Sequence, residues 1–213
     1  AVKSADQPFA LFYKGDISLL NKSNLNIAVI GVLNPDDKIE LTERMVTTEI
    51  LKCGATIVSG LALGCDTIAH KTALELSGKT VAILPGTLNS IIPKENTELA
   101  ERIVENGGCL ISEYPNGTRP QKYTFVQRDR IQAMISNKVF IVDAEKDGGT
   151  MHTADYALKF DRPLGCFIEE NGVQSPSGNR MLVDNHRASA VSNTETLIEF
   201  AGQPEYAQMT LFG

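Results

Sequence analysis

Glycine-rich turns follow four of the short apolar runs in this sequence. The runs end in Gly31, in Ser59-Gly60, in Pro85-Gly86-Thr87 and in Gly148-Gly149-Thr150. Glycine lets backbone N–H groups approach an anionic oxygen closely, and the N-terminus of a following helix adds a partial positive charge. The natural ligand of such turns is a phosphate, and we expect the four turns to converge on one phosphate-binding site.

A basic and aromatic segment, RPQKYTFVQRDR, occupies residues 119–130. It holds four basic residues and one acidic residue, a net charge of +3 in a chain whose total is −6. Basic side chains neutralise phosphates, while aromatic rings stack on unpaired bases with about 1–3 kcal/mol per base. The segment therefore predicts contacts with a single strand by Lys122, Phe125, Arg128 and Arg130. The alternative interpretation is a solvated basic loop whose aromatic residues fill the core.

Six apolar runs must position these residues. They lie at 26–31, 55–59, 80–84, 109–112, 138–143 and 164–168. Their apolar residues are consecutive instead of alternating, which is typical of strands covered on both faces. Helical patterns separate the runs, and parallel neighbouring strands need such crossover connections. We therefore predict an α/β fold of the Rossmann-like, doubly wound type, with a mostly parallel sheet and helices on both faces. Ligands of such sheets bind beyond the carboxyl ends of the strands, where the glycine turns lie.

The helix expected after the first run has one apolar face. Its apolar residues recur at spacings of 7, 4 and 3, while most polar residues fall on the other face. The apolar set is Ile39, Val46, Ile50 and Cys53, and the polar set is Glu40, Glu43, Arg44 and Lys52. We expect the polar set to face outward.

Three parts are expected along the chain. Residues 1–23 form an N-terminal extension that packs on the core, residues 24–201 form the Rossmann-like domain, and residues 202–213 form a flexible tail. Residues 169–179 are rich in glycine, serine and proline, which indicates a surface loop. A short final helix is expected at residues 194–200.

The four cysteines and three histidines do not suggest a metal or a catalytic centre. The cysteines lie 12, 44 and 57 residues apart, among apolar neighbours, without a CxxC pair. We interpret them as buried thiols in a reducing compartment. His70 is expected to pack within a helix, and no histidine lies in a nucleophile motif. We therefore predict neither metal nor cofactor, and no enzymatic activity.

The overall charge limits the kind of nucleic-acid binding to expect. The chain of 213 residues has 26 acidic and 20 basic residues. A net charge of −6 excludes indiscriminate binding to duplexes, but it is compatible with the binding of one strand at a local pocket. No apolar run approaches the roughly 20 residues of a membrane span, and the polar start does not resemble a signal peptide. We expect a cytoplasmic protein without a membrane partner.

Taken in order, several segments resemble the DNA processing protein A family (DprA, also called Smf), over residues 8–190. The matching pieces are FALFYKGDISLL, IAVIG, IVSGLALGCDTIAH, GKTVAILPGTLNSIIPKENTELAERI, GGCLISEYPNGTRP, FVQRDRIQAMIS, GGTMHTADYAL and SGNRML. The resemblance implies a non-catalytic protein of DNA processing and natural transformation, which binds single-stranded DNA as a homodimer and helps load a RecA-type recombinase. It also implies DNA contacts at the positions Gly31, Ser59, Gly60, Lys122, Phe125, Arg128 and the Gly149-Thr150 turn.

Two departures from the family pattern weaken the expected attraction for phosphate. Where the family usually has Gly-Ser-Arg after the first strand, this chain has Gly31-Val32-Leu33. The family's Phe-Pro-Arg-Arg-Asn-Arg becomes FVQRDR, with Gln127 in place of a cation and Asp129 as an added carboxylate. Because each lost phosphate contact reduces the salt dependence of binding, we expect weaker and less salt-dependent binding than in a typical member.

The end of the chain resembles a peptide that docks on the DNA sliding clamp. Gln208, Leu211 and Phe212 stand at the spacing of the QxxLF motif of bacterial replication and repair proteins. A terminal peptide of this kind inserts two apolar side chains into a preformed groove. The alternative is that Leu211 and Phe212 fold back on the domain.

A nucleotide-binding or phosphoribohydrolase-like enzyme is the alternative function. The turn Gly148-Gly149-Thr150 partly resembles that of phosphoribohydrolases, and Glu113 with Asp143 would supply carboxylates for acid–base chemistry. Against this alternative, the full glycine-threonine-glutamate pattern is lacking, as are the GxGxxG and GxxxxGK[ST] motifs.

Overall fold

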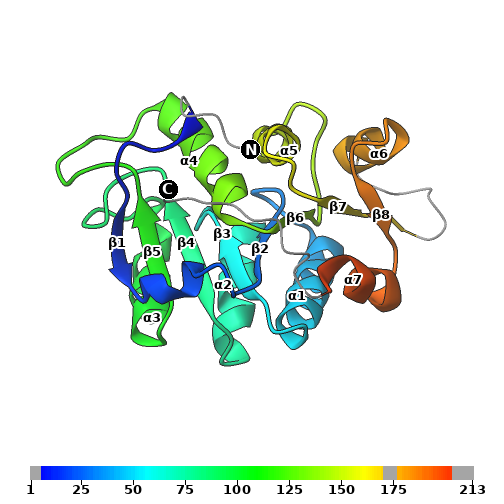
Figure 1. Cartoon of the computed structure of the whole chain (residues 1–213), viewed down its shortest axis with the longest axis horizontal. Helices are drawn as coiled ribbons and strands as arrows, with labels where there is room; N and C mark the ends of the chain where they lie inside the picture. Colours follow the sequence, from blue (N-terminus) through cyan, green and yellow to red (C-terminus); the bar gives the residue numbers. More distant parts are fainter. Residues whose placement is uncertain (1–5, 170–176, 203–213) are drawn as a thin grey trace.

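A computed structural model describes residues 6–169 and 177–202, and within them eight strands form one sheet (Figure 1). The strands are β1 Phe12–Gly15, β2 Asn26–Ile30, β3 Thr56–Ser59, β4 Thr80–Leu84, β5 Cys109–Ser112, β6 Lys138–Ile141, β7 Leu164–Phe167 and β8 Ser189–Val191. Their order across the sheet is β1-β5-β4-β3-β2-β6-β7-β8. β1 pairs antiparallel with β5, and the other pairs are parallel.

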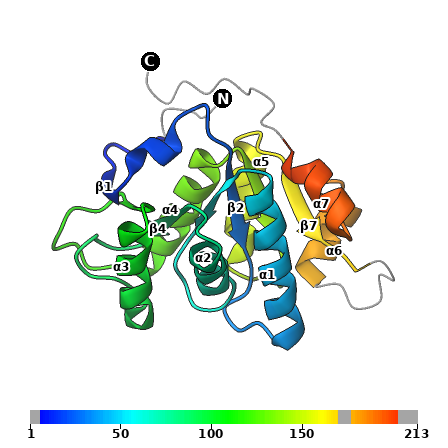
Figure 2. The same ribbon diagram turned by 90° about the horizontal axis from the view of Figure 1, so that it is seen from below.

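Helices connect the strands and cover both faces. They are α1 Asp37–Lys52, α2 Cys65–Glu75, α3 Thr97–Glu105, α4 Lys122–Ile135, α5 Thr150–Lys159, α6 Ser177–Asp184 and α7 Thr194–Ala201, with short 3-10 helices η2 Ile17–Leu20 and η3 Lys94–Asn96. Figure 2 shows α3, α2, α1 and α7 in front of the sheet, with α4 and α5 behind it. The predicted doubly wound α/β fold is confirmed.

The core is divided by the sheet into two layers. Ala28 and Ile30 of β2 pack in the cluster that also contains residues of α4, α5 and α6, whereas Ile27 and Val29 pack in the cluster with α1, α2 and α7. Because consecutive residues of a strand point to opposite faces, a run that is buried on both faces must be apolar throughout. This explains why the six predicted runs coincide with β2–β7, with ends that differ by at most two residues.

Glu43 of α1 corrects the predicted polar face of that helix. Val46 and Ile50 are buried as expected, but the side chain of Glu43 is also buried, with 0% exposure. The reason is that α1 packs against α2 as well as against the sheet, so part of its second face is covered. Burial raises the pKa of the Glu43 carboxyl group well above its usual value, and the thiol of Cys65 beside it only partly offsets this.

The N-terminal residues add an edge strand and an anchor to the core. All four residues of β1 are exposed, yet the strand pairs with β5 in register from Phe12 opposite Ser112 to Gly15 opposite Cys109. Leu19 of η2 is buried in the same cluster as α4 and α5. The N-terminal segment therefore closes one edge of the sheet.

Two segments near the end of the described chain differ from the sequence prediction. The prediction of a loop at 169–179 is wrong for its last three residues, because α6 begins at residue 177. Asn179 is fully buried, and its amide donates to the carbonyls of Val142 and Phe167, each at 3.0 Å. Such tertiary hydrogen bonds leave no local sequence signal. The final helix, α7, extends one residue beyond the predicted 194–200.

Candidate functional site

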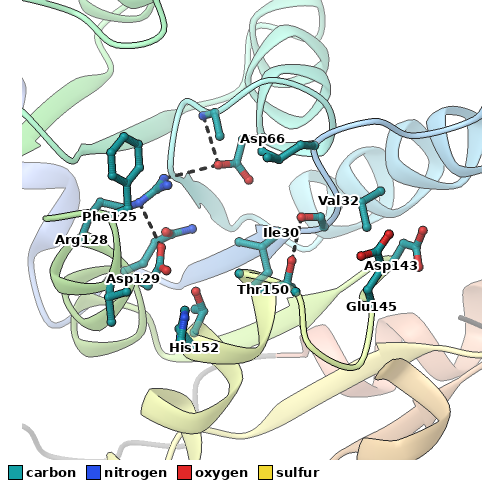
Figure 3. A pocket seen from close by; sticks show the side chains of 18 of the residues that line it. Ile30, Val32, Asp66, Phe125, Arg128, Asp129, Asp143, Glu145, Thr150 and His152 are labelled. Carbon is teal, nitrogen blue, oxygen red and sulfur yellow. Dashed lines mark hydrogen bonds and ion pairs between the residues drawn. The ribbon is translucent and has the colours of Figure 1, made fainter. Parts of the chain in front are cut away.

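A cavity of about 570 Å³ lies beyond the carboxyl ends of β2 and β6 (Figure 3). The chain winds in one direction from β2 to β5 and in the other from β6 to β8, so the connections diverge between β2 and β6. In doubly wound sheets, such a switch point opens a crevice for ligands. The cavity is lined from β2 and its loop, the β3–α2 loop, α4, the β6–α5 loop and the first turn of α5.

Three of the four glycine turns meet at this cavity. Gly31, Ala62 and the Gly148-Gly149-Thr150 turn line it. The turn after β4 does not, since a Cβ on Gly86 would contact Pro120 at 2.8 Å and its carbonyl accepts a hydrogen bond from the Ser112 hydroxyl. The expectation that all four turns converge is therefore wrong for this one.

Gly31 joins two helix N-termini to the sheet. A Cβ on this residue would overlap the sulfur of Cys65, the first residue of α2. Its carbonyl accepts a hydrogen bond of 2.8 Å from the hydroxyl of Thr150, the first residue of α5. Gly31 and Thr150 both line the cavity, and this hydrogen bond holds their two turns together.

Ser59 and Gly60, two of the predicted phosphate contacts, make hydrogen bonds to other residues of the chain. The Ser59 side chain is buried outside the cavity lining, and its hydroxyl donates to the Val29 carbonyl at 2.8 Å. The backbone N–H of Gly60 donates to Asp66 Oδ2 at 3.1 Å. Both groups therefore have partners within the protein.

Arg128 lies between two carboxylates at the wall of the cavity. Its Nη1 is 3.4 Å from Asp66 Oδ2, and its Nε is 3.0 Å from Asp129 Oδ1, as Figure 3 shows. Asp66 Oδ2 also accepts the N–H groups of Gly60 and Ala62. The guanidinium group thus holds the β3–α2 loop against α4.

The basic and aromatic segment is largely helical, because α4 begins at Lys122. The N–H of Gln121 donates to the hydroxyl of Thr124 at 3.3 Å, which closes the start of the helix. Arg119, Lys122, Tyr123 and Phe125 are exposed, and the Phe125 ring lines the cavity. Arg128 and Arg130, which follow in the next turn, are buried. The alternative interpretation, a solvated basic loop whose aromatic residues fill the core, is therefore wrong.

Arg130 makes its contacts inside the domain. Its Nη2 is 2.5 Å from Glu113 Oε2, and its Nη1 donates to the carbonyl of Asp6. Neither Arg130 nor Glu113 lines the cavity. The carboxylate pair Glu113 and Asp143, on which the alternative of an enzyme depended, is therefore not assembled there.

Carboxylates dominate the charge of the cavity. Asp66, Asp129, Asp143 and Glu145 line it, and Arg128 is the one lysine or arginine among the described lining residues. Burial raises the pKa of Asp129 to about 6, although Arg128 opposes this, and burial also raises the pKa of Asp143. Both groups consequently lose part of their tendency to ionise.

Some lining residues were not singled out from the sequence. Asp66 lies inside the segment IVSGLALGCDTIAH, but that segment does not indicate that the carboxylate lines the cavity and pairs with Arg128. Glu145 follows Asp143 by two residues and shares its turn. Gln132, a buried amide on α4, has no sequence signal at all, because a glutamine within a helix is usually exposed.

The environments of the cysteines and of His70 indicate a role in packing. Cys65, Cys109 and Cys166 are buried free thiols, as predicted, whereas Cys53 is half-buried. His70 is fully buried with Nδ1 2.7 Å from the Thr80 hydroxyl, and burial lowers its pKa to about 3.

Residues 6–169 and 177–202 contain no group of three metal-ligating side chains. In the same ranges, no helix has the length and apolar character of a membrane span. Gln208, Leu211 and Phe212 lie outside the described residues.

Comparisons with known proteins agree with the resemblance noted from the sequence. The chain is 33% identical over 195 residues to DNA processing protein DprA of Bacillus subtilis (strain 168), covering 91% of this chain and 64% of that protein. It is 33% identical over 196 residues to protein Smf of Escherichia coli (strain K12), covering 92% and 52%. The chain thus spans between half and two thirds of these curated relatives.

A solved structure of DNA processing protein A from Helicobacter pylori, described for its single-stranded DNA binding mode, is also similar. The TM-score is 0.81 at 31% identity, covering 90% of this chain and 86% of that one. The family described as DNA recombination-mediator protein A matches residues 1–202. On this match and these relatives, the chain belongs to the DNA recombination-mediator protein A family.

Proposed function

We propose that this chain binds single-stranded DNA as a non-catalytic mediator of DNA processing and recombination. The observation that carries the proposal is the surface at the start of α4, where exposed basic and aromatic side chains adjoin the cavity at the switch point of the sheet. The relatives support the same activity, since the Helicobacter pylori protein is described by its single-stranded DNA binding.

The α4 surface, defined as Arg119, Lys122, Tyr123 and Phe125, offers two kinds of contact. Neither Arg119 nor Lys122 has an ion pair with a described residue, so both cations are available to phosphates. Tyr123 is 60% exposed and Phe125 40% exposed, so both rings present faces on which unpaired bases can stack. This combination favours single strands over duplexes.

The β6–α5 turn adds a third contact at another part of the cavity lining. Nothing lies within 4 Å of a Cβ placed on Gly149, and α5 begins at the next residue. The open backbone and the helix N-terminus favour an anionic oxygen here. In this proposal, Gly149 and Thr150 contact a phosphate, while Arg128 and Arg130 act by holding the loops in place.

Fluorescence anisotropy with a labelled oligonucleotide tests the proposal. At low salt, we expect saturable binding of a single strand at micromolar protein and much weaker binding of the matching duplex. Absence of binding to the single strand at micromolar protein would contradict the proposal. Equal affinity for both forms would contradict the stacking that we assign to Tyr123 and Phe125.

We further propose that the protein acts in the cytoplasm, as a homodimer that helps a RecA-type recombinase assemble on single strands during natural transformation. The support is family membership alone, over a chain that spans part of its relatives. Sedimentation equilibrium tests the dimer, and a monomer at all concentrations would contradict it. The rate of recombinase assembly on single-stranded DNA, with and without the chain, tests the second part.

A docking peptide for the sliding clamp is a separate proposal, which rests on sequence. Gln208, Leu211 and Phe212 would occupy the groove on the clamp. Deletion of residues 208–212 is expected to abolish affinity for the clamp and to leave binding of single-stranded DNA unchanged. Unchanged clamp affinity in the deletion variant would remove this proposal.

A further inference from the structure

A groove of about 430 Å³ lies at the other end of the sheet from the cavity at β2 and β6. It opens between the ends of α1 and α2, which pack side by side on one face of the sheet (Figure 2), and it reaches the starts of β3 and β4. Because neighbouring parallel strands begin at the same end of a sheet, this groove faces away from the α4 surface. The lining of this α1–α2 groove includes Leu51, Lys52, Gly54, Leu76, Gly78 and Lys79.

Two leucines form the apolar part of the α1–α2 groove. Leu76, which caps the end of α2, is 52% exposed. Leu51, in the last turn of α1, is half-buried and packs against the core layer between α1, α2 and the sheet. A Cβ on Gly78 would lie 2.6 Å from Leu51 Cδ2, so the glycine leaves room for the Leu51 side chain in the groove. The two leucines can therefore contact an apolar side chain of a ligand.

Two lysines form the charged part of the groove. Among the described lining residues, Lys52 and Lys79 are basic, both are exposed, and none is acidic. No described carboxylate lies within ion-pair distance of Lys79, whose Nζ donates to the carbonyl of Asn106 at 2.8 Å. Lys52 pairs with Glu49 at 2.7 Å, in an exposed contact of the kind that contributes little to stability. Both ammonium groups can thus turn to a carboxylate of a ligand.

Neighbouring groups do not cancel this positive charge. Glu75, the last residue of α2, pairs with Arg44 of α1 at 3.0 Å. Carbonyls in the last turn of α1 accept the N–H groups of Cys53 and Gly54, and the N–H of Gly78 donates to a carbonyl of α2. Such pairing and capping reduce the negative charge that the two helix ends present to the groove. The groove is therefore a positively charged site in a chain whose net charge is −6.

This combination fits a segment of a protein better than a strand of nucleic acid. Phosphates would use the lysines alone, and the lining residues that the structure describes include no aromatic ring on which a base can stack. An apolar side chain flanked by carboxylates uses both parts of the groove, because the leucines contact the side chain while the lysines attract the carboxylates. The volume is also within the range of binding pockets.

We propose that the α1–α2 groove docks an acidic segment of a partner protein, in which a large apolar side chain lies between carboxylates. Leu51 and Leu76 contact the apolar side chain, and Lys52 and Lys79 pair with the carboxylates. The partner can stay bound while the α4 surface holds a strand, since the two sites lie at opposite ends of the sheet. This docking site goes beyond the proposed function and does not depend on the binding of DNA.

Fluorescence anisotropy with a labelled synthetic peptide tests the proposal. The probe peptide carries a leucine and a phenylalanine between aspartates. One control peptide has asparagines in place of the aspartates, and the other has glycines in place of the two apolar residues. We expect saturable binding of the probe at submillimolar concentration and at least about tenfold weaker binding of each control. No binding of the probe, or equal binding of the three peptides, would overturn the inference.

Two substitutions and a matched control locate the peptide. Lys79→Glu reverses a charge of the groove, Leu76→Ser removes its exposed leucine, and Lys94→Glu reverses an exposed lysine of η3 that does not line it. The first two should each weaken the probe at least about fivefold, and Lys94→Glu less than about twofold. Equal losses in Lys79→Glu and Lys94→Glu would show that the peptide senses only overall charge, which would overturn the inference. The melting temperatures should not change, since all three side chains are exposed.

NMR and a competition experiment separate this site from the DNA site. In isotope-labelled protein, the probe should shift the amide signals of Gly54 and Gly78 and leave that of Gly149 unchanged. Shifts at Gly149 alone would place the peptide at the cavity and overturn the inference. Displacement of the probe by an unlabelled single-stranded oligonucleotide would assign the groove to nucleic acid, with the same consequence. Failure of the oligonucleotide to bind the wild type would contradict the proposed function and leave the docking site standing.

Discussion

The guanidinium group of Arg128 occupies the space that a side chain at Gly60 would need. An ideal Cβ on Gly60 would overlap Arg128 Nη1 and would lie 2.7 Å from Asp66 Oδ2. The glycine therefore admits an arginine from α4, which then joins Asp66 of α2. A residue that the sequence suggested as a phosphate contact has a structural reason to be glycine.

Gly60→Ala should reduce the free energy of unfolding. The added methyl group must displace Arg128, and overpacking of this kind costs about 1–3 kcal/mol before any loss of the ion pair. Urea unfolding followed by circular dichroism measures the change. Gly149→Ala is the control, because its Cβ meets nothing within 4 Å, and its stability should stay within about 0.5 kcal/mol of the wild type. Equal stability of the two variants would contradict the close approach at Gly60.

Arg128→Ala should lower the stability of the folded protein, because Arg128 contacts carboxylates of the chain and is not proposed to contact DNA directly. Removing one partner of a buried ion pair leaves uncompensated carboxylates, here Asp66 and Asp129, and typically costs about 3–5 kcal/mol. Lys122→Ala, at an exposed residue of the same helix, should change stability by less than about 0.5 kcal/mol. Thermal unfolding of both variants checks this, and an unaltered melting temperature in Arg128→Ala would show that the arginine is not part of the structural network.

The stability of the fold should depend on Asp129 between pH 4 and 6. Burial raises the pKa of this carboxyl group from 3.8 to about 6, so the folded state binds a proton more readily than the unfolded chain. The associated stabilisation is present below about pH 4 and is lost as the pH rises through 6, with a total of about 2–3 kcal/mol. Asp129→Asn lacks this titration. The unfolding free energy of the wild type should therefore fall relative to that of the variant as the pH rises through this range, and parallel pH profiles would be evidence against it.

Glu43→Leu should stabilise the protein at neutral pH. The carboxyl group is fully buried, its pKa is raised well above the usual value, and neither oxygen makes a hydrogen bond of normal geometry. Replacing such a group with an apolar one of similar size is neutral or stabilising, here by about 1–2 kcal/mol. Glu40→Leu, at a half-buried site paired with Arg44, serves as the control and should change little. A loss of more than about 1 kcal/mol in Glu43→Leu would mean that the buried carboxyl group is needed by the fold.

The sequence predicted the strands and turns around the site better than the contacts of its side chains. The runs that became β2–β7 were recognisable because strands buried on both faces must be apolar throughout, and the glycine turns at their ends marked the cavity. The burial of Arg128 and Glu43 was not predictable, because it depends on the packing of α1 against α2 and on the ion pair of Arg128 with Asp66, between residues that are distant in the chain. The same holds for Gln132, because its burial and the lack of a hydrogen-bond partner for its Nε2 arise only in the folded protein.

The most direct test of the central claim is a matched pair of charge reversals. Lys122→Glu changes the α4 surface, whereas Lys71→Glu makes the same change at an exposed lysine of α2, on the other face of the sheet. Anisotropy titrations at one salt concentration give the affinity of each variant for a single strand. If single-stranded DNA binds at the α4 surface, Lys122→Glu should lose at least about fivefold in affinity, roughly 1 kcal/mol, while Lys71→Glu stays within about twofold. Equal losses in the two variants, or a greater loss in Lys71→Glu, would contradict the account.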